Sequence, residues 1–270
     1  MLKLIVMKKY FVVGNPIDHS LSPKLHNFWI KKNNIDAIYD KKKLQEDDIK
    51  NFLQDVRLQK ITGLNVTIPF KKKIIPYLDK LSSDAEKTQS VNTINLENSS
   101  LVGHNTDVSG FINALENLNI NLEGKKFFIL GAGGVVPSII FALKKIKVSE
   151  IIISNRTRQK AENLKSQFSN IKIVDWGKVL DFDVIINATS LGLNNEIINL
   201  NFSKIGNNKL FYDVIYNPTE TNFLKIGKKL GNKTENGKLM FLHQAAEAFK
   251  LWHGIKPDID DEVLKLLEND

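Results

Sequence analysis

The chain has 270 residues, of which 42% are hydrophobic and 25% are charged, the composition of an ordinary globular protein that is long enough for two domains. It contains no cysteine, which excludes disulfides, thiolate catalysis and cysteine-ligated zinc. The formal net charge of +8 would suit a nucleic-acid partner, but the lysines occur in small scattered clusters such as 41–43 and 71–73, with no nucleic-acid-binding motif, so solvated lysines are the simpler interpretation.

Metal, membrane and export functions are also disfavoured. The five histidines show neither HxxxH nor HExxH spacing, so no metal site is expected. The uncharged stretch 127–143 contains three glycines and Pro137, which favours a strand, a turn and a helix over a bilayer span. The apolar segment 4–6 is too short for a signal peptide, and Met7 is an alternative start. We therefore expect a cytoplasmic protein.

The first part of the chain alternates strand and helix signals. The expected strands are 10–13, one that begins at 37–39, 61–66 and two strands within 91–107 around a turn at 97–100. The expected helices are 23–33 and 46–57. Ser22 is expected to be the N-cap of the first helix, with Pro23 at its first position. This alternation predicts an α/β domain with a mostly parallel sheet.

The second part has the element order of a doubly wound dinucleotide-binding domain. The expected helices are 107–118, one ending near 146, and 157–168; the expected strands are 126–130, 150–154, 171–174, 184–187 and 210–215. Two further helices are expected at 239–252 and 260–267.

A glycine turn supplies the first cofactor signal. Residues 131–134 read GAGG between an apolar strand and a helix, where free backbone N–H groups can meet a pyrophosphate. Gly131 permits the tight turn, and Gly133 lets the backbone approach the phosphates. The third glycine of a full motif is replaced by Val136, so the motif is incomplete.

The segment after the next strand indicates which dinucleotide binds. It reads SNRTR (154–158) and has no acidic residue to hold a ribose 2′-hydroxyl. Arg156, Thr157 and Arg158 suit a 2′-phosphate, and cations at a helix start are otherwise mildly unfavourable. NADP is therefore preferred over NAD.

Polar side chains at predicted strand ends point to a hydroxylated or carboxylated substrate. Ser20 and Ser22 precede the first helix, and Thr67, Asn92 and Thr106 follow other strands. For each serine taken alone, a capping or turn role is the simpler interpretation.

Lys71 and Asp107 are candidates for a proton-handling pair. Lys71 lies at a predicted helix start, where a cation is unfavourable unless a nearby carboxylate compensates its charge. Such a pair can pass a proton to or from an alcohol oxygen while hydride moves at its carbon. Asp107 can equally be the N-cap of the following helix, and spacing alone leaves this alternative open.

Taken together, these motifs resemble the shikimate dehydrogenase family over essentially the whole chain. The matching segments, in family order, are GNPIDHSLSPKLHN (14–27), GLNVTIPFK (63–71), VNT (91–93), GHNTD (103–107), GAGG (131–134), SNRT (154–157), NATSLG (187–192), YDVIYNP (212–218), NGKLM (236–240) and QAAEAF (244–249). The resemblance implies reversible, NADPH-dependent reduction of 3-dehydroshikimate to shikimate, in the pathway to chorismate and the aromatic amino acids.

The resemblance also implies roles for individual residues. Lys71 and Asp107 would be the catalytic pair. The substrate would be bound by Ser20, Ser22, Thr67, Asn92, Tyr216 and Gln244. The cofactor would be bound by Gly131, Ala132, Gly133, Gly134, Asn155, Arg156, Thr157, Arg158, Thr189, Ile215, Gly237 and Met240.

The implied architecture has two domains. Residues 1–107 and 241–270 would form a discontinuous substrate domain, to which the C-terminal helices return, and 108–240 would form a Rossmann-like NADP domain. A monomer or a homodimer is expected.

The chain departs from the family pattern on the cofactor side. Val135, Val136 and Pro137 replace small and basic residues, and Lys160 stands where a second arginine of the 2′-phosphate clamp is usual, with Arg158 as a candidate substitute. Two alternatives remain open: a quinate/shikimate dehydrogenase of relaxed cofactor use, and a non-catalytic NADP-binding regulator on the same fold.

Overall fold

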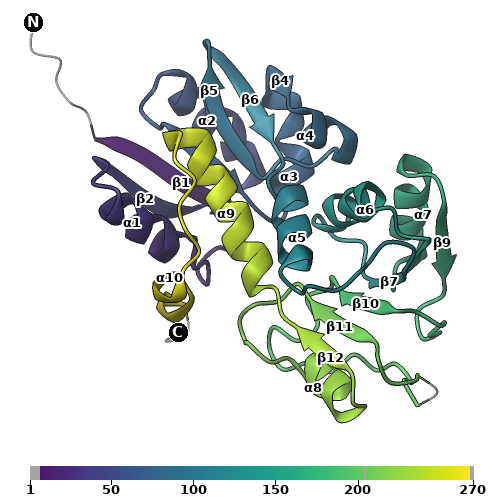
Figure 1. Cartoon of the computed structure of the whole chain (residues 1–270). Coiled ribbons are helices and arrows are strands. Elements are labelled where there is room, and N and C mark those ends of the chain that lie inside the picture. Colours follow the sequence, from purple (N-terminus) through teal and green to yellow (C-terminus); the bar gives the residue numbers. More distant parts are fainter. Residues whose placement is uncertain (1–6, 204, 268–270) are drawn as a thin grey trace, which may run out of the picture. The chain divides into compact units, whose positions relative to one another are not determined.

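Two compact units make up the part of the chain that the computed structural model describes, residues 7–203 and 205–267. The first unit comprises Met1–Asp107 and His243–Asp270, and the second comprises Val108–Leu242. The chain thus leaves the first unit and returns to it near its C-terminal end (Figure 1). The extension before Met7 lies outside the described residues.

A six-stranded mixed sheet forms the centre of the first unit, in the order β2-β1-β3-β5-β6-β4. The strands are β1 (Lys8–Gly14), β2 (Ala37–Lys43), β3 (Gly63–Val66), β4 (Lys80–Leu81), β5 (Thr93–Glu97) and β6 (Ser100–His104). The helices are α1 (Ser22–Lys32), α2 (Ile49–Arg57), α3 (Phe70–Lys73), α4 (Ser83–Thr88) and α10 (Asp261–Leu266), with short 3₁₀ helices η1 (Glu46–Asp48) and η2 (Ile75–Tyr77). Three strand pairs are parallel, and the two pairs that include β5 are antiparallel.

The hairpin of β5 and β6 brings two polar segments together. Its turn residues Asn98 and Ser99 have φ of 47° and 64°, the positive values that a two-residue type I′ turn requires at both central positions. Thr93 consequently pairs with His104. Asn92 precedes this pair by one residue and Thr106 follows it by two, and the two side chains meet at the open end of the hairpin.

Different helices cover the two faces of the first sheet. On one face, Leu53 and Val56 of α2 join a buried cluster with sheet residues such as Leu64. On the other, the Trp29 ring of α1 packs against Phe249 of α9 (Lys238–His253) with ring centroids 5.7 Å apart. The part of α9 from residue 243 onward therefore completes the core of the first unit.

Gly63 lets α9 approach the sheet closely. A Cβ atom at Gly63 would lie 2.5 Å from the Trp252 indole nitrogen, so any larger residue would displace this ring. The same nitrogen donates a hydrogen bond to the Ile94 carbonyl, 3.2 Å away. Both contacts anchor the C-terminal helix to the first sheet.

The second unit has a fully parallel sheet in the order β12-β11-β10-β7-β8-β9. The strands are β7 (Lys126–Leu130), β8 (Glu150–Ser154), β9 (Ile171–Val174), β10 (Val184–Asn187), β11 (Leu210–Asp213) and β12 (Lys233–Glu235). The helices are α5 (Asp107–Glu116), α6 (Val136–Lys145), α7 (Arg158–Gln167), α8 (Asn222–Lys229) and the start of α9.

Both faces of this second sheet are buried. Phe127 and Ile129 of β7 face a cluster supplied by α5, α6 and α7, whereas Phe128 and Leu130 face a cluster that includes residues of α8. Figure 1 shows α6 and α7 on one side of the sheet and α8 on the other. Coverage of both faces explains the near-continuous apolar runs of these strands. The predicted two-domain α/β fold, with a doubly wound second unit, is confirmed.

Some local predictions differ from the structure. Ser22 is the first residue of α1 rather than its N-cap, because Leu21 takes the N-cap position, and the Ser22 N–H instead meets the Ser20 hydroxyl at 3.4 Å. The stretch 127–143 forms β7, the glycine turn and most of α6. Across the described residues, every helix is too short or too polar to cross a bilayer.

Candidate active site

Lys71 and Asp107 form an ion pair in the first unit, with Lys71 Nζ 2.5 Å from Asp107 Oδ2. Their side chains are only 12% and 7% exposed, so water screens the pair much less than a surface salt bridge. Lys71 lies on α3 and Asp107 is the first residue of α5. The structure thus brings together the two residues that sequence spacing left as an open question.

Asn92 holds the other oxygen of Asp107. The Asn92 amide nitrogen lies 3.0 Å from Asp107 Oδ1 and 2.9 Å from the Thr106 hydroxyl, and its carbonyl oxygen accepts the Thr106 N–H at 2.8 Å. The same amide nitrogen lies 3.3 Å from Gln244 Oε1 of α9. One asparagine therefore connects three expected site residues and fixes the orientation of the carboxylate.

Asn65 and Tyr39 extend this hydrogen-bond network, and neither residue was predicted from the sequence. The Asn65 amide nitrogen donates to the backbone carbonyl of Asn92 at 3.1 Å and to the Thr93 hydroxyl at 3.0 Å. The Tyr39 hydroxyl donates to Asn65 Oδ1 at 2.6 Å. The available signal was the asparagine within GLNV, since a polar residue in a fully buried strand needs hydrogen-bond partners.

The loop that carries Ser20 and Ser22 is tied to the turn that carries Thr67. The Asn15 N–H donates to the Ile68 carbonyl at 2.9 Å, and a Cβ atom at Gly14 would lie 2.5 Å from the Thr67 methyl group. Close approach of these two segments therefore requires glycine at position 14. Thr67 in turn begins the tight turn that leads into α3 and Lys71.

The glycine turn of the second unit follows β7. Gly131 has φ of +113°, and a Cβ atom there would lie 2.7 Å from the Ala188 carbonyl oxygen, so glycine is required. Gly133 and Gly134 are exposed, which leaves their backbone accessible to a ligand. Val136 is fully buried in the core, and Pro137 lies in the first turn of α6, where its missing N–H costs no helical hydrogen bond. Val136, which replaces the third glycine of the motif, therefore faces the core.

The basic residues after β8 differ in their partners. Arg158 pairs with Glu162 (Nε to Oε1, 3.1 Å) and with Asp175 (Nη1 to Oδ1, 2.5 Å). Arg156 and Lys160 are exposed and form no ion pair with any residue that the structure describes. These two cations are therefore the ones available to a phosphate.

Thr189, Ile215 and Gly237 lie on loops of the second unit, and Met240 lies in the first turn of α9. The Thr189 hydroxyl donates to Asn187 Oδ1 at 2.7 Å. The Gly237 N–H donates to the Ile215 carbonyl at 3.0 Å. A Cβ atom at Gly237 would lie 2.1 Å from the Val214 carbonyl oxygen, so glycine is needed there as well. Met240 is buried in the core.

Three further expected residues are Tyr216, Asn155 and Thr157. Tyr216 belongs to the second unit and stacks on Phe241 with ring centroids 4.5 Å apart. Asn155 donates from its amide nitrogen to the Thr157 carbonyl at 2.8 Å. This bond shapes the turn at the start of α7, where the basic residues lie.

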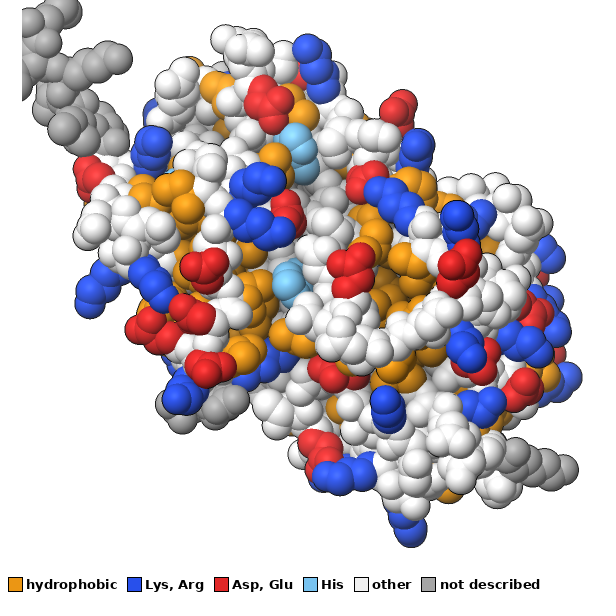
Figure 2. Space-filling view, viewed as in Figure 1, with side chains coloured by type: hydrophobic (Ala, Val, Ile, Leu, Met, Phe, Trp, Pro, Cys, Tyr) orange, Lys and Arg blue, Asp and Glu red, His pale blue; other side chains and the backbone are white. Residues whose placement is uncertain are grey.

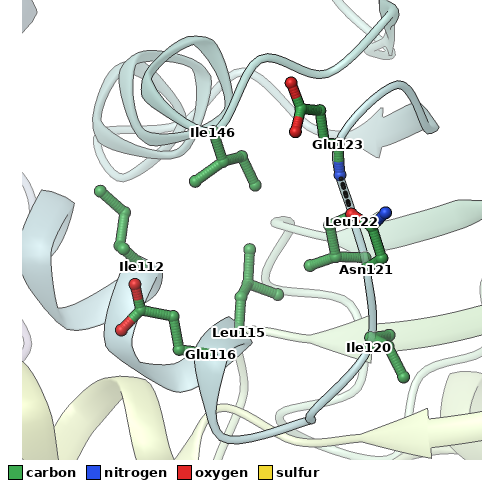
Figure 3. Close-up of a pocket in the computed structure, with 8 residues that line it drawn as sticks. All are labelled: Ile112, Leu115, Glu116, Ile120, Asn121, Leu122, Glu123 and Ile146. Atoms are coloured by element: carbon green, nitrogen blue, oxygen red, sulfur yellow. Dashed lines mark hydrogen bonds between the residues drawn. The ribbon is translucent and has the colours of Figure 1, made fainter.

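A surface pocket of about 230 Å³ in the second unit is separate from these residues (Figure 3). Ile112, Leu115, Leu122 and Ile146 form its apolar lining, and the carboxylates of Glu116 and Glu123 lie at its edges. None of the expected catalytic, substrate or cofactor residues lines it.

Figure 2 shows lysines and arginines interspersed with acidic side chains over the visible face, without one continuous basic patch. Within 7–203 and 205–267, histidine, aspartate and glutamate side chains form no group of three that could hold a metal ion.

A doubly wound unit with a glycine turn, joined to a unit with a Lys–Asp pair in a polar network, is typical of two-domain dinucleotide-dependent oxidoreductases. The chain belongs to the shikimate dehydrogenase family. Three family models match it: the shikimate dehydrogenase substrate binding domain over 12–94, shikimate / quinate 5-dehydrogenase over 113–239, and the shikimate 5′-dehydrogenase C-terminal domain over 239–261.

Individual relatives match over nearly the full length. A shikimate dehydrogenase (NADP(+)) of Pelagibacter ubique is 56% identical over 264 residues, covering 97% of this chain and 100% of the relative. The crystal structure of shikimate dehydrogenase from Aquifex aeolicus is 34% identical with a TM-score of 0.91, covering 97% and 98% of the two chains. The Thermus thermophilus shikimate 5-dehydrogenase in complex with NADP(H) and shikimate is 31% identical with a TM-score of 0.88, covering 97% and 100%.

Proposed function

We propose that this protein catalyses the reversible, NADPH-dependent reduction of 3-dehydroshikimate to shikimate, on the route to chorismate and the aromatic amino acids. Family membership and the names of its relatives support the reaction and the cofactor. The observation that carries the proposal is the nearly buried ion pair of Lys71 and Asp107, held by Asn92.

Lys71 handles the proton in this proposal. The reduction adds hydride to the carbonyl carbon and a proton to the carbonyl oxygen, and bound NADPH supplies the hydride. The Lys71 ammonium group donates the proton to the oxygen, and in the reverse direction the neutral amine accepts it from the hydroxyl. Asp107 orients Lys71 Nζ and balances its charge, while Asn92 keeps the carboxylate in place.

Uncharged hydrogen-bonding side chains can bind the hydroxyl and carboxylate groups of the substrate. We assign this role to the hydroxyl groups of Ser20, Ser22, Thr67 and Tyr216 and to the amide groups of Asn92 and Gln244. The hydrogen-bonded contact between Asn92 and Gln244 supports a shared role for these two amides.

The cofactor residues are assigned to the second unit. The turn of Gly131, Ala132, Gly133 and Gly134 would meet the pyrophosphate. Asn155, Arg156, Thr157 and Arg158 would surround the 2′-phosphate. Arg158 already pairs with Glu162 and Asp175, whereas Arg156 and Lys160 have no carboxylate partner within 7–203 and 205–267. Thr189, Ile215, Gly237 and Met240 would complete the site. The substrate residues other than Tyr216 thus belong to the first unit, and the cofactor residues belong to the second.

Location and assembly follow from the same proposal. A biosynthetic enzyme that uses NADPH and a small polar substrate fits a cytoplasmic location. We expect a monomer or a homodimer, which light scattering of the purified protein would distinguish.

A four-way assay tests the proposed function. Purified protein is incubated with shikimate or quinate, each with NADP⁺ or NAD⁺, and reduction of the nicotinamide is followed by its absorbance. Activity confined to shikimate with NADP⁺ supports the proposal. Comparable activity with quinate indicates the relaxed quinate/shikimate enzyme, and inactivity in all four combinations favours the non-catalytic regulator.

A further inference from the structure

A fully buried polar cluster lies at the carboxyl ends of β10 and β11 in the second unit. Asn187 and Asp213 are 0% exposed, and Thr221 is 1% exposed. Asn187 ends β10 and Asp213 ends the neighbouring β11. Burying a carboxylate is costly unless strong hydrogen bonds compensate it, so such a group needs a specific explanation.

Asp213 accepts hydrogen bonds from three separate segments. Its Oδ1 accepts the Ile215 N–H at 3.0 Å, and its Oδ2 accepts the Thr221 hydroxyl at 2.6 Å. Both oxygens lie 3.1 Å from the Asn187 amide nitrogen. Burial raises the pKa of the Asp213 carboxyl above its ordinary value, and the bonds from Thr221, Ile215 and Asn187 offset part of this rise.

The carboxylate sets the orientation of the Asn187 amide. A carboxylate only accepts hydrogen bonds, so the Asn187 NH₂ group must face Asp213 and its carbonyl oxygen must face the other way. This oxygen then accepts both the Thr189 N–H at 3.1 Å and the Thr189 hydroxyl at 2.7 Å. The NH₂ group also donates to the Leu191 carbonyl at 3.0 Å. The polarity of Asp213 thereby fixes the loop from 188 to 191.

This loop touches the glycine turn directly. The Ala188 carbonyl oxygen is the atom that a Cβ at Gly131 would meet at 2.7 Å. Ile215, whose N–H donates to Asp213, accepts the Gly237 N–H through its backbone carbonyl at 3.0 Å. The glycine turn, Thr189, Ile215 and Gly237 are all expected cofactor residues. Ile215 contacts Asp213 directly, Thr189 and Gly237 are two contacts away, and the glycine turn is one contact beyond the 188–189 loop.

We propose that Asp213 is a positioning residue for NADP(H): through Asn187 and the Ile215 N–H it holds Thr189, the glycine turn and the 215–237 contact in the arrangement that receives the cofactor. The proposal rests on the proposed function, because these residues are assigned to the cofactor there. Asp213 is fully buried and acts through these hydrogen-bonded partners.

The variant Asp213→Asn tests this role, because it keeps the shape and removes one acceptor. Its new NH₂ group confronts the Asn187 NH₂ group, so the Asn187 amide turns over and presents NH₂ to the Thr189 N–H. We expect the Kd for NADP⁺, measured by calorimetry, to rise at least tenfold. The KM for shikimate should stay within threefold of wild type.

The exchanged double variant Asn187→Asp/Asp213→Asn again places one carboxylate opposite one amide. Its carboxylate at 187 accepts both Thr189 and the new amide at 213. We expect the Kd for NADP⁺ to return to within about threefold of wild type. Hydrogen exchange of the 188–192 backbone, measured without cofactor, should be faster in the single variant and slower again in the double variant.

Asn232→Ala is a matched control at the amino ends of the neighbouring strands β11 and β12, where the buried Asn232 side chain accepts the Lys209 N–H at 2.9 Å. It should lower Tm without changing NADP⁺ affinity. If Asp213→Asn behaves like this control, or weakens both ligands equally without recovery in the double variant, the inference is wrong. If wild-type protein binds no NADP⁺ at all, the proposed function falls and the inference falls with it.

Discussion

The His26 imidazole stacks on the Tyr39 ring, with centroids 4.2 Å apart and planes within 3° of parallel. The Tyr39 hydroxyl is the donor that holds Asn65, and Asn65 holds the Asn92 backbone. A buried aromatic cluster in the core of the first unit is thus linked by three hydrogen-bonding side chains to the carboxylate beside Lys71.

This buried histidine makes the protein sensitive to acid. Burial, with a smaller contribution from His253, lowers the pKa of His26 from 6.5 to about 3. Below pH 6.5 the unfolded chain binds a proton at this residue that the folded chain does not, so stability falls as the pH drops towards the folded-state pKa. At pH 5 the loss from His26 is about 2 kcal/mol. Burial likewise lowers the pKa of His253 to about 4, which adds to the effect.

The variant His26→Phe should remove the His26 contribution while keeping an aromatic ring at the stacking position. Urea unfolding at pH 7 and pH 5 measures the change. We expect the stability difference between the two pH values to shrink by about 2 kcal/mol relative to wild type. The exposed His19 offers a control, since His19→Gln should leave the difference unchanged. An unaltered pH dependence in His26→Phe would contradict the assignment.

Removal of either member of the ion pair should stop turnover without abolishing cofactor binding. For Lys71→Ala and Asp107→Ala we expect kcat to fall by about 10²–10⁴-fold, the usual contribution of a positioned proton-transfer group. The Kd for NADP⁺ should stay within about twofold, because the expected cofactor residues lie in the second unit. Steady-state kinetics and calorimetry provide the two readouts, and near-wild-type kcat in both variants would refute the catalytic assignment.

The two arginines after β8 should differ in their effect on the cofactor. Arg156 has no carboxylate partner among the described residues, whereas Arg158 already pairs with Glu162 and Asp175. We expect Arg156→Ala to raise the KM for NADP⁺ about tenfold or more, since a hydrogen-bonded charge contact of 1.4 kcal/mol or more is lost. Arg158→Ala should raise it less than threefold. Equal effects would show that Arg158 leaves its ion pairs to bind the phosphate.

Glycines 131 and 133 should respond differently to alanine. Gly131→Ala introduces a residue at φ +113° and a Cβ atom 2.7 Å from the Ala188 oxygen, so we expect a loss of about 1–3 kcal/mol in stability. A Cβ atom at Gly133 has room, since its nearest neighbour is 3.9 Å away. Gly133→Ala should therefore keep Tm and weaken NADP⁺ binding, as measured by thermal unfolding and calorimetry. A normal NADP⁺ affinity in Gly133→Ala would argue against a pyrophosphate at this turn.

Sequence patterns predicted the second unit better than the edges of the first. Strands β7, β8, β9 and β10 have the predicted bounds, because burial on both faces produces uninterrupted apolar runs. By contrast, only the start of β2 was predicted, at 37–39, and the strand continues to Lys43. Its later residues are exposed charges on an edge strand, so they carry no apolar signal. The short α4, α8, β4 and β12 were missed altogether.

The residues of the candidate site were also predicted only in part. The motifs located Lys71, Asp107 and the glycine turn by position, and Asn92 was placed among the substrate residues. Its role as the centre of a hydrogen-bond network depends on the β5–β6 hairpin, which brings residues 92 and 106 together. Asn65 and Asp213 were missed as supporting residues because their partners are distant in the sequence.

The discontinuity of the first unit has a consequence for how the protein is made. A ribosome delivers the whole uninterrupted second unit before it delivers Phe249 and Trp252, which cover one face of the first sheet. Gln244, the partner of Asn92, also belongs to this late segment. The first unit to begin synthesis is therefore the last to acquire its complete core, and nascent chains carry an uncovered apolar sheet face until the final helices emerge.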